Sequence, residues 1–405
     1  MMNARVVLGA LLVTGGLLAS GCSLLDVDET SGQEAVSFRT YGRRAVGGQR
    51  SVWKAGVALP ATAASQGATT RAGDSYIAPG GNFATGDTIV VFGFYHPGDG
   101  VTDGSWAAEN AAGTNIPDFM YDQAVIKQAN GSWDYSPKKY WPNEYGTGAT
   151  SAHKDKLSFW GYYPKSAAGL TLYAAGTTNA YTNATSGLPK IHFCQSTDPD
   201  EQVDLMLSTL LSDLYKTQAH EVDEETWHYG ALTNGQVGLT FCHALALVEI
   251  EIAEGTGADV TYFGLTNIYR SGTLENPATL TWTGQGDSHD FEEENMEVTG
   301  TNIATLLMMP QTLSADATLT IDYDIEFDSF DPSHPDPIVY SGETITAKLF
   351  KNTGDPAVDY GVTAWLPGHH YVYRVSRGLD RIEFEEIVEA GADWDLYTPE
   401  IDVTD

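Results

Sequence analysis

The sequence predicts an all-β protein made of two antiparallel β-sandwich domains. Glycine and tyrosine are abundant, at 42 and 21 of 405 residues, and short runs of Val, Ile, Leu, Thr and Phe recur between turn signals. No apolar period of 3.6 residues persists beyond about three turns, apart from a weak helical candidate near 205–215. Short strands at regular spacing, without repeated helical segments, are typical of β-sandwiches.

The overall charge excludes nucleic acid as a partner. The net charge is −33, from 54 acidic and 21 basic residues. A surface that binds phosphate needs clustered lysine and arginine, and a chain with this excess of carboxylates repels phosphate instead.

The first residues resemble a bacterial lipoprotein signal. Arg5 precedes the apolar run VVLGALLVTGGLLASG, which ends directly at Cys22. A basic start, a short apolar segment and small residues before the cut are typical of a secretory signal. We therefore expect residues 1–21 to be removed, Cys22 to be lipidated, and residues 22–35 to tether the protein to the outer membrane at the cell surface. The alternative is an ordinary signal peptide with an incidental cysteine.

Residues 36–215 are predicted to form the first domain. A strand candidate, AVSFRTY at 35–41, is followed by a loose segment, 42–84, which is rich in Gly, Ala, Thr and Arg. Such weakly packed chain is where proteases cut. Further along, Asn130-Gly131 is a strong signal for a hairpin turn. The other expected strands of this domain are 85–96, the two arms of the hairpin at 119–137, 156–164 and 188–195.

Residues 236–394 are predicted to form the second domain. The strand pattern is lost over 209–235, which carries the charge run HEVDEET, so we place the domain boundary there. Residues 395–405 form a short acidic tail. The strands expected in this domain are 237–253, 259–268, 277–283, 303–309, 317–327, 344–350, 370–377 and 381–390.

The run LTFCHALALVEIEI at 239–252 places Cys242 beside His243. Successive side chains of a strand point to opposite faces, so the thiol and the imidazole cannot act as a nucleophile and its base, or bind one metal. We expect a core strand, with Cys242 as a small apolar residue and His243 bonded to a backbone group.

Other candidates for chemistry are weak. The sequence has no GxSxG, HExxH, P-loop or paired CxxC motif, so we expect no catalytic residue, metal or cofactor. Cys194 and Cys242 remain as thiols, and a disulfide between them is left open. The acidic stretch at 322–337 is compatible with Ca²⁺ binding or with a solvated loop. It contains Asp322, Asp324, Asp328, Asp331 and Asp336.

Three aromatic residues offer a different kind of site. Trp133, Tyr140 and Trp141 lie within WDYSPKKYWPNEY, beside prolines at the end of a strand. They are candidates for stacking on sugar rings, and the alternative is that they cap a hydrophobic core.

Several motifs in order resemble the fimbrillins, the pilin-type lipoproteins of Bacteroidales. They follow the lipoprotein signal and span nearly the whole chain. They are TTRAG, GDTIVVFGF, FMYDQAVIKQANGSWDYSPKKYWP, LSFWGYYP, QVDLMLS, VGLTFCHALALVEIEI, WLPGHHYVYRV and IEFEEIVEAGADW.

The resemblance implies two transthyretin-like β-sandwich domains, no catalysis, and a role as a subunit or accessory of an adhesive fimbria. In this family an Arg-specific protease removes the first strand, and a strand from a neighbouring subunit takes its place. Here Arg71, or secondly Arg44, matches the processing site. The displaced strand would be AVSFRTY, with Val36, Phe38 and Thr40 on one face.

The resemblance also indicates the partners. We expect other fimbrial subunits, the outer membrane through the lipid anchor, and a host or bacterial surface ligand. The acidic tail at 395–405 is poor material for a strand with an apolar inward face, which favours a tip, anchor or ancillary subunit over a stalk subunit. The alternative function is a surface glycan-binding lipoprotein that uses the three aromatic residues.

Overall fold

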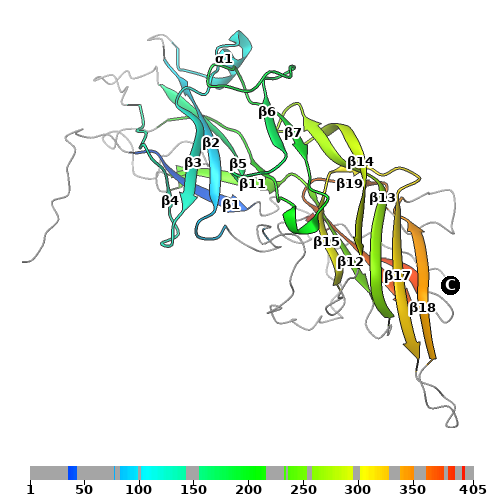
Figure 1. The fold of residues 1–405 in the computed structure, drawn as a ribbon. Coiled ribbons are helices and arrows are strands. Elements are labelled where there is room, and N and C mark those ends of the chain that lie inside the picture. The colour runs from blue at the N-terminus through cyan, green and yellow to red at the C-terminus, as the bar shows by residue number, and fades with distance from the viewer. Residues whose placement is uncertain are drawn as a thin grey trace, which may run out of the picture. The chain divides into compact units, whose positions relative to one another are not determined.

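The structure of the protein is a computed structural model (Figure 1). Met1–Glu34 and Ala35–Asp405 are separate units, and every described residue belongs to the second. The structure describes residues 35–42, 77, 83–98, 102–142, 155–215, 232–233, 236–252, 258–294, 302–327, 338–350, 362–377, 382–387 and 395–396.

The first sheet contains the N-terminal strand at its edge. Its order is β1 (Ser37–Gly42), β11 (Gln236–His243), β8 (Met206–Ser208), β5 (Lys156–Tyr163), β2 (Thr88–His96), β3 (Met120–Lys127) and β4 (Trp133–Asp134). The short strands β9 (Leu211–Leu214) and β10 (Leu232–Thr233) pair with β5 and β11. A single α-helix among the described residues, α1 (Trp106–Ala112), follows β2.

Two further sheets contain most of the described strands of the second half of the chain, and one of them also includes β6 (Leu170–Tyr173) and β7 (Lys190–Cys194) from the first half. That sheet has the order β18 (Ile338–Lys348), β17 (Thr318–Phe327), β13 (Ala258–Leu274), β7 and β6, with β14 (Trp282–Glu294) beside β13. The other has the order β15 (Asn302–Met308), β12 (Ala246–Ile252), β20 (His369–Arg377) and β21 (Ile382–Ile387), with β22 (Asp395–Leu396) beside β20. The strands β16 (Gln311–Thr312) and β19 (Ala364–Trp365) pair with each other, and a 3₁₀ turn spans Pro199–Glu201. The predicted all-β class is confirmed, and the transthyretin-like topology stays a prediction.

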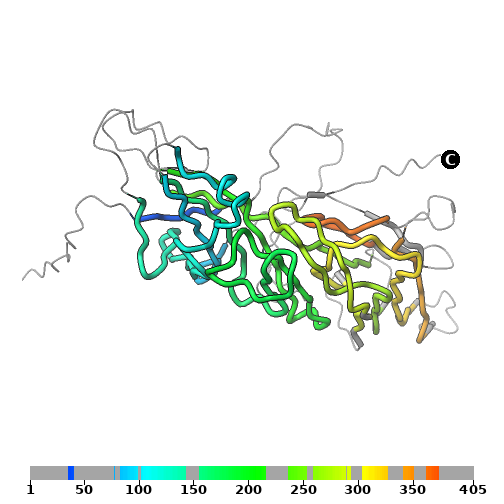
Figure 2. The backbone as a smooth tube through the Cα atoms, turned by 90° about the horizontal axis from the view of Figure 1, so that it is seen from above, coloured from blue at the N-terminus to red at the C-terminus, as the bar shows by residue number. Residues whose placement is uncertain are grey.

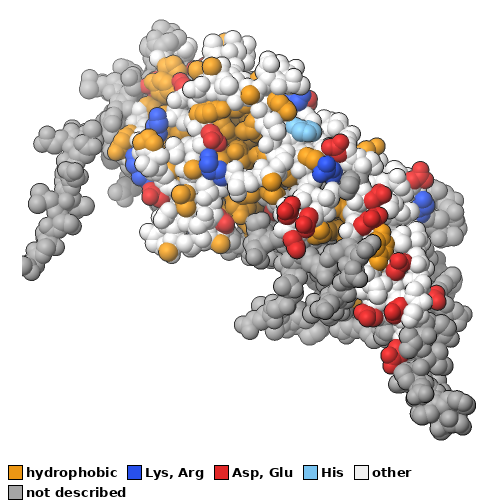
Figure 3. Space-filling view, viewed as in Figure 1, with side chains coloured by type: hydrophobic (Ala, Val, Ile, Leu, Met, Phe, Trp, Pro, Cys, Tyr) orange, Lys and Arg blue, Asp and Glu red, His pale blue; other side chains and the backbone are white. Residues whose placement is uncertain are grey.

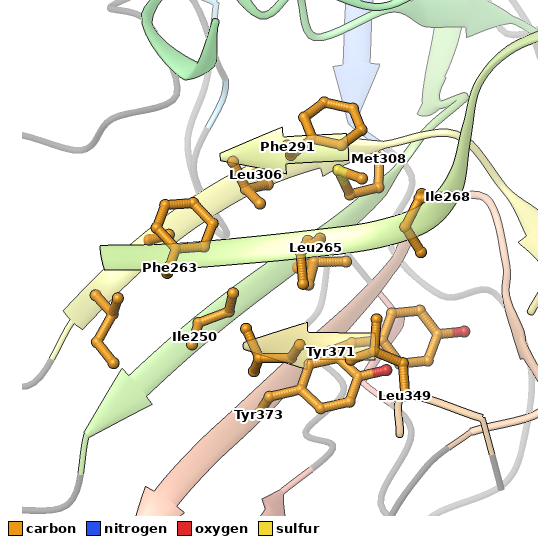
Figure 4. Packing of buried hydrophobic residues seen from close by; sticks show 14 of the residues in the cluster. Ile250, Phe263, Leu265, Ile268, Phe291, Leu306, Met308, Leu349, Tyr371 and Tyr373 are labelled. Atoms are coloured by element: carbon orange, nitrogen blue, oxygen red, sulfur yellow. The ribbon is translucent and has the colours of Figure 1, made fainter. Parts of the chain in front are cut away.

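These two sheets pack face to face around one hydrophobic core. Apolar side chains of β12, β15 and β20 meet those of β13, β14 and β17, as Figure 4 shows for Ile250, Leu306 and Phe263. Because a sheet face must bury its apolar side chains against another element, this arrangement is that of a β-sandwich.

The first sheet is covered on both faces. In β2, Val90, Phe92 and Phe94 belong to one core cluster, whereas Ile89 and Val91 belong to another. Alternate residues of a strand point to opposite faces, so a strand covered on both sides reads as a continuous apolar run. This explains the sequence TIVVFGFYH, in which six consecutive buried residues, 89–94, include no polar side chain and alternate between the two faces.

The run at 239–252 differs from the single strand that was expected. It is divided after His243: β11 belongs to the first sheet, and β12 belongs to the sandwich. Ala244 and Leu245, between the two strands, are fully buried. The predicted domain boundary over residues 209–235 stays a prediction. In the structure β11, which follows this boundary, hydrogen-bonds to β1 and β8, which precede it.

Three strand pairs also differ from the antiparallel expectation. β1 runs parallel to β11, and β20 runs parallel to both β12 and β22. These pairs join strands that are distant in the sequence, so no tight hairpin turn forces them to run antiparallel.

Candidate functional site

The candidate site is the edge of the first sheet that β1 occupies. Its register with β11 runs from Ser37 opposite Gln236 to Gly42 opposite Phe241. The other pairs described in this sheet are antiparallel, and β1 lies at one end of the strand order. Figure 2 shows the strand, in dark blue, against the cyan and green part of the chain. An edge strand is held by one backbone ladder only, which makes it the strand that a sheet can exchange most readily.

Burial alternates along β1 with a period of two. Val36 and Phe38 are each 1% exposed and belong to the core beneath the sheet, whereas Arg39 is exposed on the other face. The Phe38 ring makes edge contacts with Tyr135 and Phe159, with centroids 5.6 Å apart in both cases. Burying a side chain such as Val or Phe stabilises a fold by about 1.5–3 kcal/mol. Both the side-chain pockets and the backbone hydrogen bonds to β11 therefore hold β1 in the sheet.

Polar contacts from β4 and the residues after it hold the same strand. The Trp133 indole Nε1 donates to Thr40 Oγ1 over 3.1 Å, and the Tyr135 hydroxyl donates to the Val36 carbonyl over 2.7 Å. The Val36 amide in turn donates to the Lys139 carbonyl over 2.8 Å. Burial is the main reason that the pKa of Tyr135 is raised to about 12, so its hydroxyl stays a donor at neutral pH.

The chain enters this core again just before β2. The Ile77 amide donates to Asp204 Oδ2 over 3.0 Å, and Ile77 packs against the core cluster that contains Phe38. The Phe83 ring makes edge contacts with Trp133 and Phe241, with centroid distances of 5.4 and 5.5 Å. The chain is therefore anchored on both sides of residues 43–76, by β1 before them and by Ile77 and Phe83 after them.

Asp204 is held by a histidine of β11. His243 Nδ1 lies 2.8 Å from Asp204 Oδ1, and their side chains are 2% and 0% exposed. The sequence predicts a buried histidine with a backbone partner, and the structure shows it buried, with its Nδ1 bonded to this carboxylate. Cys242, the residue before His243 in the strand, is partly exposed, and no disulfide joins it to Cys194. A buried carboxylate with two donors is satisfied, and Asp204 thereby links β11 to the backbone at Ile77.

Sequence reasoning missed the roles of Tyr135 and Asp204, although the sequence around each residue indicates that its side chain is buried. Tyr135 stands two residues after Trp133, so period-two alternation places both side chains on one face. Asp204 is an acidic residue in the otherwise apolar stretch VDLML, and an aspartate inside a buried run needs a partner.

A second hydrogen-bonded group has the connectivity of a hydrolase triad. His96 Nε2 lies 2.8 Å from Ser158 Oγ, and His96 Nδ1 lies 2.7 Å from Glu109 Oε2 on α1. However, Ser158 is 0% exposed, and its Oγ also accepts a hydrogen bond from the Asp213 amide. A nucleophile needs a neighbouring space for the reacting carbonyl, which a fully buried hydroxyl does not have. We interpret this group as a structural link between α1, β2 and β5.

The three aromatic candidates for sugar stacking do not form a common platform. Trp133 and Trp141 are buried in the core under β1, at 6% and 2% exposure. Tyr140 alone among the three has an exposed ring. This corresponds to the alternative in which such residues cap a hydrophobic core.

Acidic side chains gather over β13, β17 and β18, as the lower part of Figure 3 shows. In the predicted acidic stretch, Asp322 Oδ1 accepts a hydrogen bond from the Thr344 hydroxyl, and Asp324 Oδ1 accepts one from the Gly342 amide. Residues 328–337 lie outside the described part of the chain. Within that part, no group of three or more His, Cys, Asp or Glu side chains is placed to hold a metal ion.

The family model for fimbrillin-like proteins matches residues 70–384. The chain belongs to the fimbrillin-like family. This match covers most of the chain, including the strands from β2 to β20 and the aromatic residues that hold β1. No curated protein matches this fimbrillin-like chain.

Two solved structures illustrate the similarity. A fimbrial protein from Bacteroides vulgatus shares 18% identity, with a TM-score of 0.49 over 74% of this chain and 91% of that one. The tip fimbrial protein Mfa3 from Porphyromonas gingivalis, with a C-terminal truncation, shares 10% identity, with a TM-score of 0.35 over 75% and 93% of the two chains.

Three predicted sites of this fimbrillin-like chain lie outside the described residues. They are the lipidation site Cys22 and the processing sites Arg44 and Arg71. Among the residues described, no helix is both long and apolar enough to cross a bilayer.

Proposed function

We propose that this fimbrillin-like protein is a cell-surface subunit or accessory of an adhesive fimbria, as a tip or anchor component, and that it assembles by strand exchange. The observation that carries the proposal is the placement of β1. An edge strand with two buried apolar side chains is followed by a stretch that carries Arg44 and Arg71. The chain then returns to the same core at Ile77.

Removal of β1 would create an acceptor for another strand. The edge of β11 would present unpaired backbone N–H and C=O groups, and the positions of Val36 and Phe38 would become apolar pockets. A strand from a neighbouring subunit can restore both the ladder and the buried side chains, which is β-augmentation. The remaining strands of the sheet pair with one another without β1, so they can keep their arrangement during the exchange.

We assign the protein no catalytic role. Membership of a fimbrillin-like family supports this view, as does the burial of Ser158 in the arrangement that most resembles a hydrolase site.

Limited trypsin treatment of the mature chain tests strand exchange. Cleavage is expected to release a fragment that ends at Arg71 or Arg44, while the rest keeps its β-sheet circular dichroism signal. The cut protein should then bind a peptide of residues 35–42 or form polymers. A chain in which Arg43, Arg44, Arg50, Lys54 and Arg71 are all replaced by alanine is the control, because trypsin can cut after each of them, and it should neither bind the peptide nor polymerise. A cut chain that stays monomeric and binds no peptide would contradict strand exchange.

Anchoring is proposed to depend on Cys22, because the apolar run ends there in ASGC. The Cys22→Ala chain is expected to lose labelling by radioactive fatty acid and to accumulate as an uncleaved precursor. Cys242→Ala serves as the matched control and should be labelled normally. Fatty-acid labelling that persists in the Cys22→Ala chain would rule out this anchor.

A further inference from the structure

Trp133 in β4 and Tyr135 just after it contact different parts of the N-terminal strand. Trp133 donates its single N–H to a side-chain oxygen, Thr40 Oγ1, whereas Tyr135 donates to a backbone oxygen, the Val36 carbonyl. Both residues are buried, at 6% and 4% exposure. A tryptophan N–H can only donate, and a buried donor without an acceptor is costly. The contact at Thr40 therefore depends on the sequence of the strand, and the contact at Val36 does not.

We propose that Trp133 and Tyr135 determine which strand can replace β1 and in which register. The entering strand runs parallel to β11, carries apolar side chains at the positions of Val36 and Phe38, and carries a hydrogen-bond acceptor in its side chain at the position of Thr40. The partner that binds at this edge is thus an extended segment of another subunit. Its side chains follow the pattern apolar-x-apolar-x-acceptor, where the acceptor residue is Thr, Ser, Asn or Asp. This inference rests on the strand exchange proposed above.

The register follows from the spacing of the contacts. The Val36 carbonyl and the Thr40 side chain are four residues apart on one strand, and Tyr135 and Trp133 meet them at the two ends of that interval. A strand shifted by one residue would turn its apolar side chains to the opposite face and present the wrong residue to Trp133. A strand shifted by two residues would keep its apolar face, but the side-chain acceptor would no longer lie opposite the indole N–H. Trp133 therefore adds to the discrimination between registers that turn the same face of the strand to the core.

Competition between peptides on the cut chain tests the proposal. The mature chain is nicked with trypsin, and binding of fluorescent peptides with the sequence of residues 35–42 is followed by anisotropy. The Thr40→Val peptide, which keeps the shape but loses the acceptor, is expected to bind about 5- to 10-fold more weakly. The Thr40→Ser peptide, which keeps the acceptor, and the Ser37→Ala peptide, which is changed on the other face, should stay within about twofold.

The same peptides on two substituted chains assign the effect to its cause. On a Trp133→Phe chain the Thr40→Val peptide should bind as well as the unsubstituted peptide, because the donor is absent. On a Tyr135→Phe chain the affinities of all the peptides should fall by the same factor. If the Trp133→Phe chain does not fold, the Thr40→Val and Thr40→Ser peptides on the unsubstituted chain decide alone.

The outcomes separate this inference from the proposed function. Equal binding of the Thr40→Val and unsubstituted peptides to the native chain would overturn the role of Trp133 and leave strand exchange intact. A Thr40→Val penalty that persists on the Trp133→Phe chain would overturn it as well. If no peptide binds, strand exchange fails and this inference fails with it.

Discussion

Replacing Phe38 with alanine is expected to lower the free energy of unfolding by about 3–5 kcal/mol. The ring is 1% exposed and contacts Tyr135 and Phe159, so its removal leaves a cavity under an edge strand. Because the strand then loses its largest buried side chain and keeps its ladder, Val36 and the polar contacts from Trp133, Tyr135 and Lys139, it should also separate from the sheet more often. Urea unfolding measures the first effect, and the rate of tryptic cleavage after β1 measures the second.

Ser37→Ala is the matched control for this substitution. Ser37 is the neighbouring residue of the same strand and points to the opposite face, so its replacement should change stability by no more than about 0.5 kcal/mol. Equal stability of the Phe38→Ala and Ser37→Ala chains would show that β1 is not seated in this core.

The second large effect is expected at Asp204. Its replacement by alanine removes the buried carboxylate that accepts the Ile77 amide and lies against His243 Nδ1, and the loss of these two hydrogen bonds should cost about 2–5 kcal/mol. Asp204→Asn keeps an acceptor oxygen and should cost less. Thermal unfolding measures the loss, and hydrogen exchange at the Ile77 amide should become faster in the Asp204→Ala chain.

Asp200→Ala controls for the change of charge. Asp200 lies four residues earlier, in the 3₁₀ turn at Pro199–Glu201, and its side chain is exposed. Its loss should leave both the unfolding temperature and the exchange at Ile77 unchanged. Similar behaviour of the two alanine variants would mean that the buried Asp204 does not hold the segment at Ile77.

The strand at the site was predictable because its signal is local. AVSFRTY alternates apolar and polar residues, and this period alone places Val36 and Phe38 on one face. The all-β class was predictable for the same reason, since the pattern recurs in short runs along the chain. The resemblance to fimbrillins added the idea that this strand is exchanged, which alternation cannot provide.

The partners of the strand were not predictable, because pairing is not local. Alternation gives the face of a side chain and not the element that covers that face. His243 and Asp204 are 39 positions apart and meet only through the fold. In the same way, Trp133 was considered for sugar stacking from its aromatic neighbours, whereas the structure places it against Thr40, 93 positions away.

The parallel pairing of β1 with β11 has a consequence for the order of folding. β1, the most N-terminal of the described strands, pairs with a strand from the second half of the chain, and the entropic cost of closing a loop grows with its length. Each of the other described strands of the sheet, including β11, pairs with at least one strand besides β1. The other strands of the sheet can therefore fold before β1 pairs with β11. Until then the edge of β11 is open, and a strand from another chain can pair with it.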